Sequence, residues 1–218
     1  MPRWTLWIAS LTLASLTLAT AISVSAADTL YQQDFTGLKG PELPDEFLVL
    51  DGSFSIRDEA GNRFAELPGA PLESYGFLFG PNEASGVEAG ARIFGTKSGR
   101  KQPTFSLGLN GASGYRLQVA PAKDTIELVR GDSIVASAPF QWKSGQWTQV
   151  RIRVRKVSES EHRVEGRVWL DGSPEPVDPM ITFTETKLQP SGKASVWGMP
   201  FSGTPVRFDD LKVTRLSN

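Results

Sequence analysis

The sequence predicts an all-β fold made of antiparallel sheet. Between Trp147 and Gly172, apolar and polar residues alternate in two runs joined by a polar turn, the pattern of strands with one buried and one wet face. An antiparallel sheet can leave one face in water, whereas a parallel sheet covered by helices gives continuous apolar runs. From Thr29 onward, short β-type runs are separated by Gly, Pro, Asn, Asp and Ser, without helical periodicity.

The N-terminal residues are expected to lie outside this fold. Arg3 is followed by an apolar stretch from Trp4 to Val24, and small residues at 23–27 suit a signal peptidase. We therefore expect a cleavable signal peptide over residues 1–26 and one domain over residues 27–218. The alternative is an uncleaved membrane anchor, because the stretch nearly reaches the ~20 residues that a spanning helix needs.

Composition narrows the possible partners. Cleavage after Ala26 leaves 192 of the 218 residues, enough for one all-β core, with 22 Lys and Arg against 24 Asp and Glu. That balance argues against a nucleic-acid partner, which requires a basic face. The chain has no cysteine, so disulfides, thiol catalysis and Cys-ligated zinc are excluded. We expect a secreted or periplasmic protein that is not inserted in a membrane after cleavage; the sequence predicts no oligomeric state.

Alternation and turn residues predict fifteen strands. In chain order they are Leu30–Phe35, Phe47–Leu50, Ser53–Arg57, Arg63–Leu67, Tyr75–Phe79, Val87–Phe94, Thr104–Leu109, Tyr115–Ala120, Thr125–Arg130, Ser133–Ala138, Thr148–Arg155, Arg163–Leu170, Ile181–Thr184, Ala194–Trp197 and Val206–Leu216. Dipeptides such as Asn110-Gly111 supply the positive φ angles of tight hairpins. The three prolines of residues 173–179 exclude a central strand and predict a loop.

The last strand carries a local irregularity. Its apolar phase slips by one residue at Asp209-Asp210, which would turn every later side chain to the other face unless a β-bulge absorbs the slip. We therefore predict a bulge there. Because chain ends often lie close together, this strand is expected to pair near residues 30–35 and close a sandwich.

Several segments resemble a known superfamily. These are Gln141–Trp147 (QWKSGQW), the tip Val168–Gly172 (VWLDG) and the closing run Phe208–Val213 (FDDLKV). The pattern is similar to the concanavalin A-like lectin/glucanase superfamily, in particular laminin-G-like and 3-keto-disaccharide-hydrolase-like domains. The resemblance implies a jelly-roll sandwich of two curved antiparallel sheets with a glycan-binding concave face. The glucanase motif E-x-D-x-x-E is absent, so we carry over no catalytic residue.

Aromatic residues on polar strand faces are the strongest sign of a ligand. Trp169 falls on the polar phase of its strand, and sugars stack their apolar C–H faces on such rings while polar groups orient them. We expect an exported, non-catalytic β-sandwich that binds a glycan or cell-surface polymer, with Trp169 as the stacking platform. The hydrogen-bonding residues expected beside it are Arg167, Arg151, Arg153 and Glu165. The alternative is that another segment covers this face and makes the ring part of a core.

Two other functions stay open. A glycoside or keto-disaccharide hydrolase would need two carboxylates in one cleft, and Glu88, Glu127 and Glu165 fall on wet faces, where the alternative is that they are solvated strand charges. The single histidine, His162, lies at a charged hairpin tip, which disfavours a base. The third function is a structural or adhesive module that binds another protein.

A structural calcium ion is the only cofactor that the sequence suggests. Asp34 lies near the expected first strand and Asp209 and Asp210 lie in the last, so pairing of these strands would bring hard oxygen ligands together. The alternative is that these are ordinary turn and edge-strand aspartates.

Overall fold

The computed structural model describes residue 1, residues 28–69 and residues 73–217. The expected signal peptide, apart from Met1, therefore lies outside the described residues. These residues form fifteen strands and one short 3-10 helix, η1 (Pro121–Lys123). The strands are β1 (Thr29–Gln33), β2 (Leu48–Asp51), β3 (Ser55–Glu59), β4 (Asn62–Leu67), β5 (Tyr75–Glu83), β6 (Val87–Phe94), β7 (Thr104–Leu109), β8 (Tyr115–Ala120), β9 (Thr125–Arg130), β10 (Ser133–Pro139), β11 (Thr148–Lys156), β12 (His162–Leu170), β13 (Ile181–Glu185), β14 (Gly192–Met199) and β15 (Val206–Arg215).

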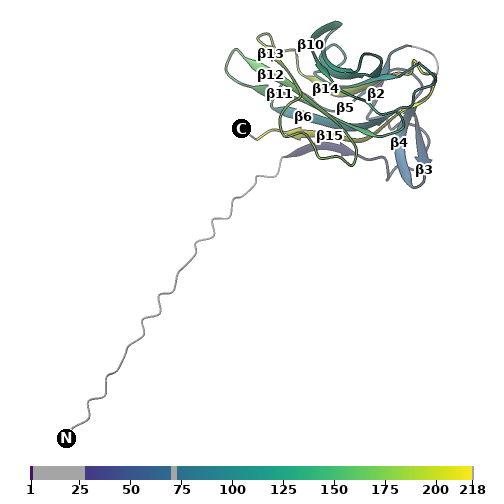
Figure 1. Cartoon of the computed structure of the whole chain (residues 1–218), viewed down its shortest axis with the longest axis horizontal. Helices are drawn as coiled ribbons and strands as arrows, with labels where there is room; N and C mark the ends of the chain where they lie inside the picture. The colour runs from purple at the N-terminus through teal and green to yellow at the C-terminus, as the bar shows by residue number, and fades with distance from the viewer. Residues whose placement is uncertain (2–27, 70–72, 218) are drawn as a thin grey trace.

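The strands form two antiparallel sheets packed face to face (Figure 1). Sheet A has the order β13-β12-β11-β6-β15-β4-β3, with β1 paired to β15, and sheet B has the order β10-β9-β8-β7-β14-β5-β2. The predicted all-β sandwich is confirmed, and β6 to β9 have the predicted bounds. Among the described residues, no helix is long and apolar enough to span a membrane.

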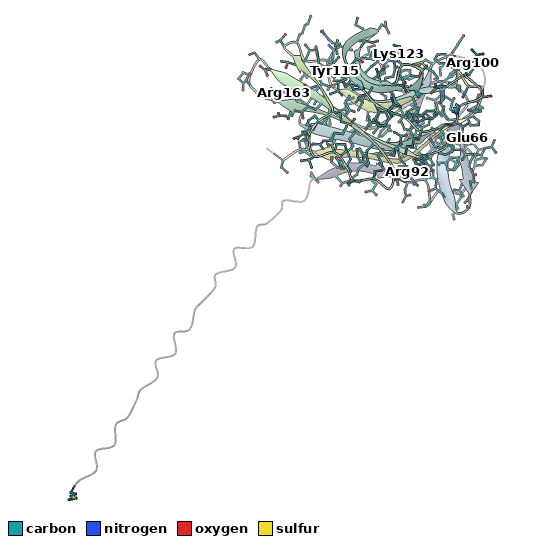
Figure 2. All side chains as sticks on the ribbon, viewed as in Figure 1. Glu66, Arg92, Arg100, Tyr115, Lys123 and Arg163 are labelled. Atoms are coloured by element: carbon teal, nitrogen blue, oxygen red, sulfur yellow. The ribbon has the colours of Figure 1, made fainter. Side chains whose placement is uncertain are left out.

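The core lies between the sheets and is filled by alternate residues of each strand. Sheet A contributes branched side chains such as Val150, Ile152 and Val154, and sheet B contributes larger ones such as Phe77 and Phe105, all at 0% exposure. Every second residue therefore points outward from one of the sheets, and charged side chains such as Lys123 and Arg163 lie on the outside of the sandwich (Figure 2). The wet residues predicted for β11 and β12 lie on the outer face of sheet A.

The end of the chain follows the predicted irregularity. The pairing of β15 with β6 shifts register between Asp209 and Lys212, and Asp210 has a φ of 50°. This confirms the bulge, which keeps Phe208, Leu211 and Val213 buried despite the slip in phase. β1 pairs antiparallel with β15, as predicted, and is the purple strand next to β15 in Figure 1.

The register of three central strands determines which side chains share the outer face of sheet A. Across β12, β11 and β6, Arg167 lies opposite Arg151, which lies opposite Gly90. Gly90 in turn lies opposite Lys212 of β15. Residues 173–179, predicted as a loop, contain no strand. The loop brings the Glu175 carboxylate within 3.0 Å of the Arg167 guanidinium on this face.

Candidate functional site

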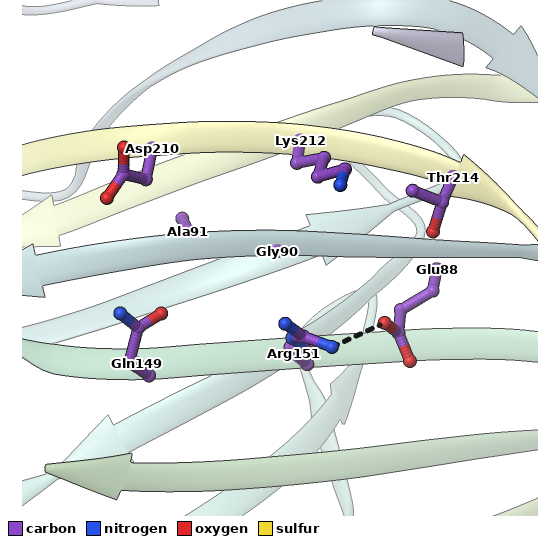
Figure 3. Close-up of a pocket in the computed structure, with 8 residues that line it drawn as sticks. All are labelled: Glu88, Gly90, Ala91, Gln149, Arg151, Asp210, Lys212 and Thr214. Carbon is purple, nitrogen blue, oxygen red and sulfur yellow. Dashed lines mark hydrogen bonds and ion pairs between the residues drawn. The ribbon is translucent and has the colours of Figure 1, made fainter. Parts of the chain in front are cut away.

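A groove of about 260 Å³ opens on the outer face of sheet A, over β6, β11 and β15 (Figure 3). It is lined by Glu88, Gly90, Ala91, Gln149, Arg151, Asp210, Lys212 and Thr214. Gly90 forms the middle of its floor, since its register partners on the two sides are Arg151 and Lys212. The groove is therefore a gap in the row of outward side chains, bordered by one cation on each side.

The gap exists because Gly90 has no side chain. A Cβ built at this position would meet only the Arg151 side chain, at 3.8 Å, which is ordinary van der Waals contact. A glycine inside a strand weakens the strand and often marks a place where a ligand or another backbone approaches closely. The outer face of sheet A thus leaves open a position that most residue types would fill.

Arg151 connects the groove to the predicted tryptophan. Its Cζ lies 5.4 Å from the centre of the Trp169 ring, a cation–π arrangement. Its Nη1 lies 3.4 Å from Glu88 Oε1 and 3.1 Å from Glu175 Oε2. Arg151 is held between a ring and two carboxylates, while Lys212 makes no ion pair within the part of the chain that the structure describes.

Glu88 is one of the two acidic residues that line the groove, the other being Asp210, and its side chain is only 14% exposed. Burial raises the pKa of Glu88 above its ordinary value, and the charge of Glu175 adds to this, while Arg151 acts in the opposite direction. Because burial dominates, the favourable contact with Arg151 does not fully offset the loss of water around this carboxylate. A ligand hydroxyl that donates a hydrogen bond to Glu88 would replace some of that water.

The five predicted binding residues share the outer face of sheet A, but they are not equally accessible. Trp169 is half-buried, and Arg167 donates a hydrogen bond to Glu175 at 3.0 Å. Glu165 was expected on a wet face, but it is 4% exposed. Both of its carboxylate oxygens accept hydrogen bonds, from Arg153 and Arg155. The expectation that Glu165 faces solvent is wrong, because these long arginine side chains contact its carboxylate and cover it. Of the five predicted residues, only Arg151 lines the groove.

The aspartates expected to bind calcium are held by other groups. Arg92 Nη2 lies 2.6 Å from Asp209 Oδ2, and Arg92 Nε lies 2.9 Å from Asp210 Oδ2. The positive charge beside these two carboxylates is therefore an arginine side chain. Asp34 Oδ1 accepts hydrogen bonds from the backbone N–H and the hydroxyl of Thr36, which lowers the pKa of Asp34. Among the described residues, no cluster of three or more His, Cys, Asp or Glu side chains could hold a metal ion. The arrangement does not support the predicted calcium site.

A second groove of about 360 Å³ opens farther along the same face. Its lining comprises Glu59, Ala60, Asn62, Phe64, Arg92, Phe94, Trp147 and Arg207. Three aromatic rings meet there, with the Trp147 ring centre 5.5 Å from Phe94 and 5.9 Å from Phe64. Arg92 Cζ lies 4.7 Å from the Trp147 ring centre. Arg92 also joins the two grooves, because it lines the second and its partner Asp210 lines the first.

Several groove residues were missed by the sequence analysis. Lys212, Thr214 and Gln149 lie at alternating, outward positions, so nothing in their own strands distinguishes them from solvated surface residues. Gly90 carried a usable signal, since it interrupts the alternation of β6 with a residue that strands disfavour. Glu88 was considered as one of a pair of catalytic carboxylates or as a solvated strand charge. Its burial beside Arg151 depends on which strand lies next to β6, and spacing in the sequence does not predict that.

The outer face of sheet B is built differently. Trp197, in β14, lies against Gly76 of β5, and Arg116 Cζ is 5.2 Å from its ring centre. Ser106 and Ser195 point outward yet are 0% exposed, and the Trp197 indole N–H donates a hydrogen bond to Ser195 Oγ at 3.0 Å. A large ring and a guanidinium thus cover the small residues of this sheet.

Sequence comparison finds no relative: no known family model matches the chain, and no curated protein matches it. Solved structures do match. A carbohydrate-binding module, CBM66, from Bacillus subtilis has a TM-score of 0.54 at 11% identity and covers 78% of this chain and 95% of its own. A Bacillus subtilis protein of unknown function with a galectin-like fold has a TM-score of 0.58 at 10% identity, covering 86% and 96%.

An enzyme domain has the same architecture. The catalytic domain of a glycoside hydrolase family 131 protein from Coprinopsis cinerea has a TM-score of 0.55 at 10% identity and covers 85% of this chain and 94% of its own. Identities this low show a shared fold and leave activity open, since one fold carries many functions. The chain shares the antiparallel sandwich fold of these proteins, and such a sandwich is what the resemblance implied.

Proposed function

We propose that this protein is exported and binds carbohydrate, as a free glycan or a cell-surface polymer, without cleaving it. The observation that carries the proposal is the Gly90 groove, where a side-chain-free floor is bordered by Arg151 and Lys212. Hydrogen-bond acceptors and hydrogen-bond donors surround this floor in nearly equal numbers. Export rests on the predicted signal peptide.

Sugar hydroxyls both donate and accept hydrogen bonds, so a site for them needs both kinds of partner. Glu88 and Asp210 supply carboxylate acceptors, Arg151 and Lys212 supply charged donors, and Gln149 supplies both. Charges of the two signs balance within the groove, which suits a neutral polyhydroxylated ligand better than a polyanion. Trp169 contributes by supporting the Arg151 guanidinium from below, in place of the stacking role that the sequence suggested.

The fold comparison supports the same class of ligand. Its matches include a carbohydrate-binding module and the carbohydrate recognition domain of Emp47p, the latter with a TM-score of 0.56. The glycoside hydrolase match makes an enzyme the competing function.

The placement of carboxylates favours binding over hydrolysis. Glu88 and Glu165 are register partners of Arg153 on its two sides, so their backbones lie about 10 Å apart across β11. An inverting glycosidase needs a water molecule between two such carboxylates. Here the Arg153 side chain bonds Glu165 directly, and Glu165 is almost fully buried. We therefore expect no release of reducing sugar or keto-sugar from any substrate that binds.

A Gly90→Val variant tests the site, because a branched side chain fills the groove while favouring the strand. We expect affinity for the best-binding polysaccharide to fall at least tenfold, measured by affinity electrophoresis and isothermal titration calorimetry across a polysaccharide panel. Gly37→Val is the matched control, since Gly37 is exposed in a turn with no neighbour within 4 Å of an added Cβ. Unchanged affinity in Gly90→Val would remove the groove from the proposal, and cleavage products would favour the enzyme.

A further inference from the structure

We propose that the two grooves on sheet A are adjacent subsites for one extended polysaccharide chain, so that the protein recognises internal stretches of a polymer instead of a single terminal sugar. This inference rests on the proposed function and names the class of ligand more closely.

The sizes of the grooves are the first support. Their volumes of about 260 and 360 Å³ lie near the lower end, roughly 300 Å³, of pockets that enclose a whole small ligand. Each is therefore suited to about one sugar ring. An isolated sugar would use one groove and leave the other empty.

Their alignment is the second support. Both grooves contain residues of β6, with Glu88 and Gly90 in the first and Arg92 and Phe94 in the second. Strand residues advance about 3.3 Å each, so the two grooves together follow roughly 20 Å of this strand. A chain several sugars long can lie along that distance on one face of the sheet.

The border between the grooves is a fixed element. Arg92 is held by Asp209 at 2.6 Å, by Asp210 at 2.9 Å and by Asn62 Oδ1 at 2.6 Å. Asp209 is only 1% exposed, so this cluster is anchored in the protein. A ligand that crosses from one groove to the other passes over a border that is already ordered, which lowers the entropic cost of binding.

The two linings differ in chemistry, which gives each groove a separate role. Most side chains that line the first groove are polar, while the second combines partly exposed rings of Trp147 and Phe94 with the guanidinium of Arg207. Arg207 Cζ lies 5.1 Å from the Phe94 ring centre and 4.7 Å from that of Phe64. The first groove selects hydroxyl positions, and the second adds contact area with the apolar faces of the next sugars.

The experiment measures affinity against chain length. Oligosaccharides of increasing length, cut from the polysaccharide that binds best, are titrated calorimetrically into the full-length mature protein. We expect affinity to rise about tenfold from short to long oligosaccharides and then level off once both grooves are filled. In Trp147→Ala we expect this rise to disappear.

A second variant guards against loss of packing around Phe64. Arg207→Met keeps an aliphatic stem over Phe64 and Phe94 while removing the N–H donors, and we expect it to reduce the rise with length by at least threefold. Phe201→Ala, which removes an exposed ring outside both grooves, is the control and should retain the full rise.

The outcomes separate the two proposals. Binding that is independent of length, or a full rise retained in both Trp147→Ala and Arg207→Met, overturns the two-subsite inference and leaves glycan binding intact. Failure of every polysaccharide and oligosaccharide to bind overturns the proposed function, and the inference falls with it.

Discussion

Two glycines in equivalent settings have opposite consequences on the two outer faces of this sandwich. Gly90 in sheet A and Gly76 in sheet B each lie inside a strand at an outward position. Over Gly76 the space is filled, since an added Cβ would lie 2.7 Å from the Trp197 ring and 2.6 Å from the backbone oxygen of Val196. Over Gly90 the space is open apart from the side of Arg151.

The difference follows from what the neighbouring strands supply. Beside Gly76, β14 supplies the flat ring of Trp197, which packs against the glycine. Beside Gly90, Arg151 is drawn toward Glu88, Glu175 and Trp169, so it stands at the edge of the gap. A glycine in a strand therefore makes a groove only when its neighbours are held elsewhere.

Gly76→Ala should produce the largest effect on stability. The added Cβ meets a backbone oxygen that cannot move without disturbing the sheet, so we expect a loss of about 3 kcal/mol, at the upper end for overpacking. The measurement is urea denaturation of wild type and variant. Adding Trp197→Ala should recover little of the lost stability, because the contact with the Val196 backbone oxygen remains. Full recovery would show that the contact with the Trp197 ring alone causes the loss.

Removal of one arginine from each face extends the comparison to charge. Arg92→Ala leaves Asp209 almost fully buried without its cation, and we expect a loss of about 2 kcal/mol, below the 3–5 of a completely buried pair because Arg92 is 19% exposed. Arg116, whose pKa is lowered by burial, donates to a backbone oxygen of Gly131, so Arg116→Ala should cost about 1 kcal/mol. Equal losses in denaturation experiments would contradict this ranking.

The pH dependence of the stability of Glu88→Gln should show how much the buried charge of Glu88 destabilises the folded protein. A carboxyl whose pKa is raised in the folded protein favours the folded state below its ordinary pKa, and this contribution is lost as the pH rises through the raised value. The variant should therefore melt like wild type below about pH 4 and at a higher temperature than wild type at pH 7.

A matched substitution on sheet B should behave in the opposite way. Glu127 is 3% exposed, but its oxygens accept hydrogen bonds from Lys123 at 2.8 Å and Gln118 at 2.9 Å. Glu127→Gln removes one of these bonds and should lower the melting temperature at pH 7. A lower melting temperature for Glu88→Gln at pH 7 would mean that its contact with Arg151 outweighs burial.

Gly90→Ala should have the smallest effect and complete the glycine comparison. Its Cβ fits without strain and alanine restricts the unfolded chain more than glycine does, so we expect a gain of about 0.5 kcal/mol. Thermal denaturation followed by circular dichroism measures it. A loss of 1 kcal/mol or more would show that the gap over Gly90 is tighter than the structure indicates.

Much of the fold was predictable because its signals are local. Alternation in β11 and β12, hairpin turns such as Asn110-Gly111 and the phase slip at Asp209 each depend on residues close together in the sequence, and the structure confirms all three. The candidate site was predictable only in part. Trp169 and Arg151 lie on the outer face of sheet A, as their strand phase predicted, while the binding role of this face stays a prediction. The burial of Glu165 was not predicted, since it depends on the contacts of Arg153 and Arg155 with its carboxylate.

By itself, the sequence determined which residues form strands and which side of each strand is apolar, because burial of alternate side chains is a property of each segment. The tertiary structure decided which strands lie beside one another, and hence that Gly90 falls between Arg151 and Lys212 and that Arg92 meets two aspartates. Those neighbours are far apart in the chain. A groove is a property of several strands in one register, and no single strand encodes it.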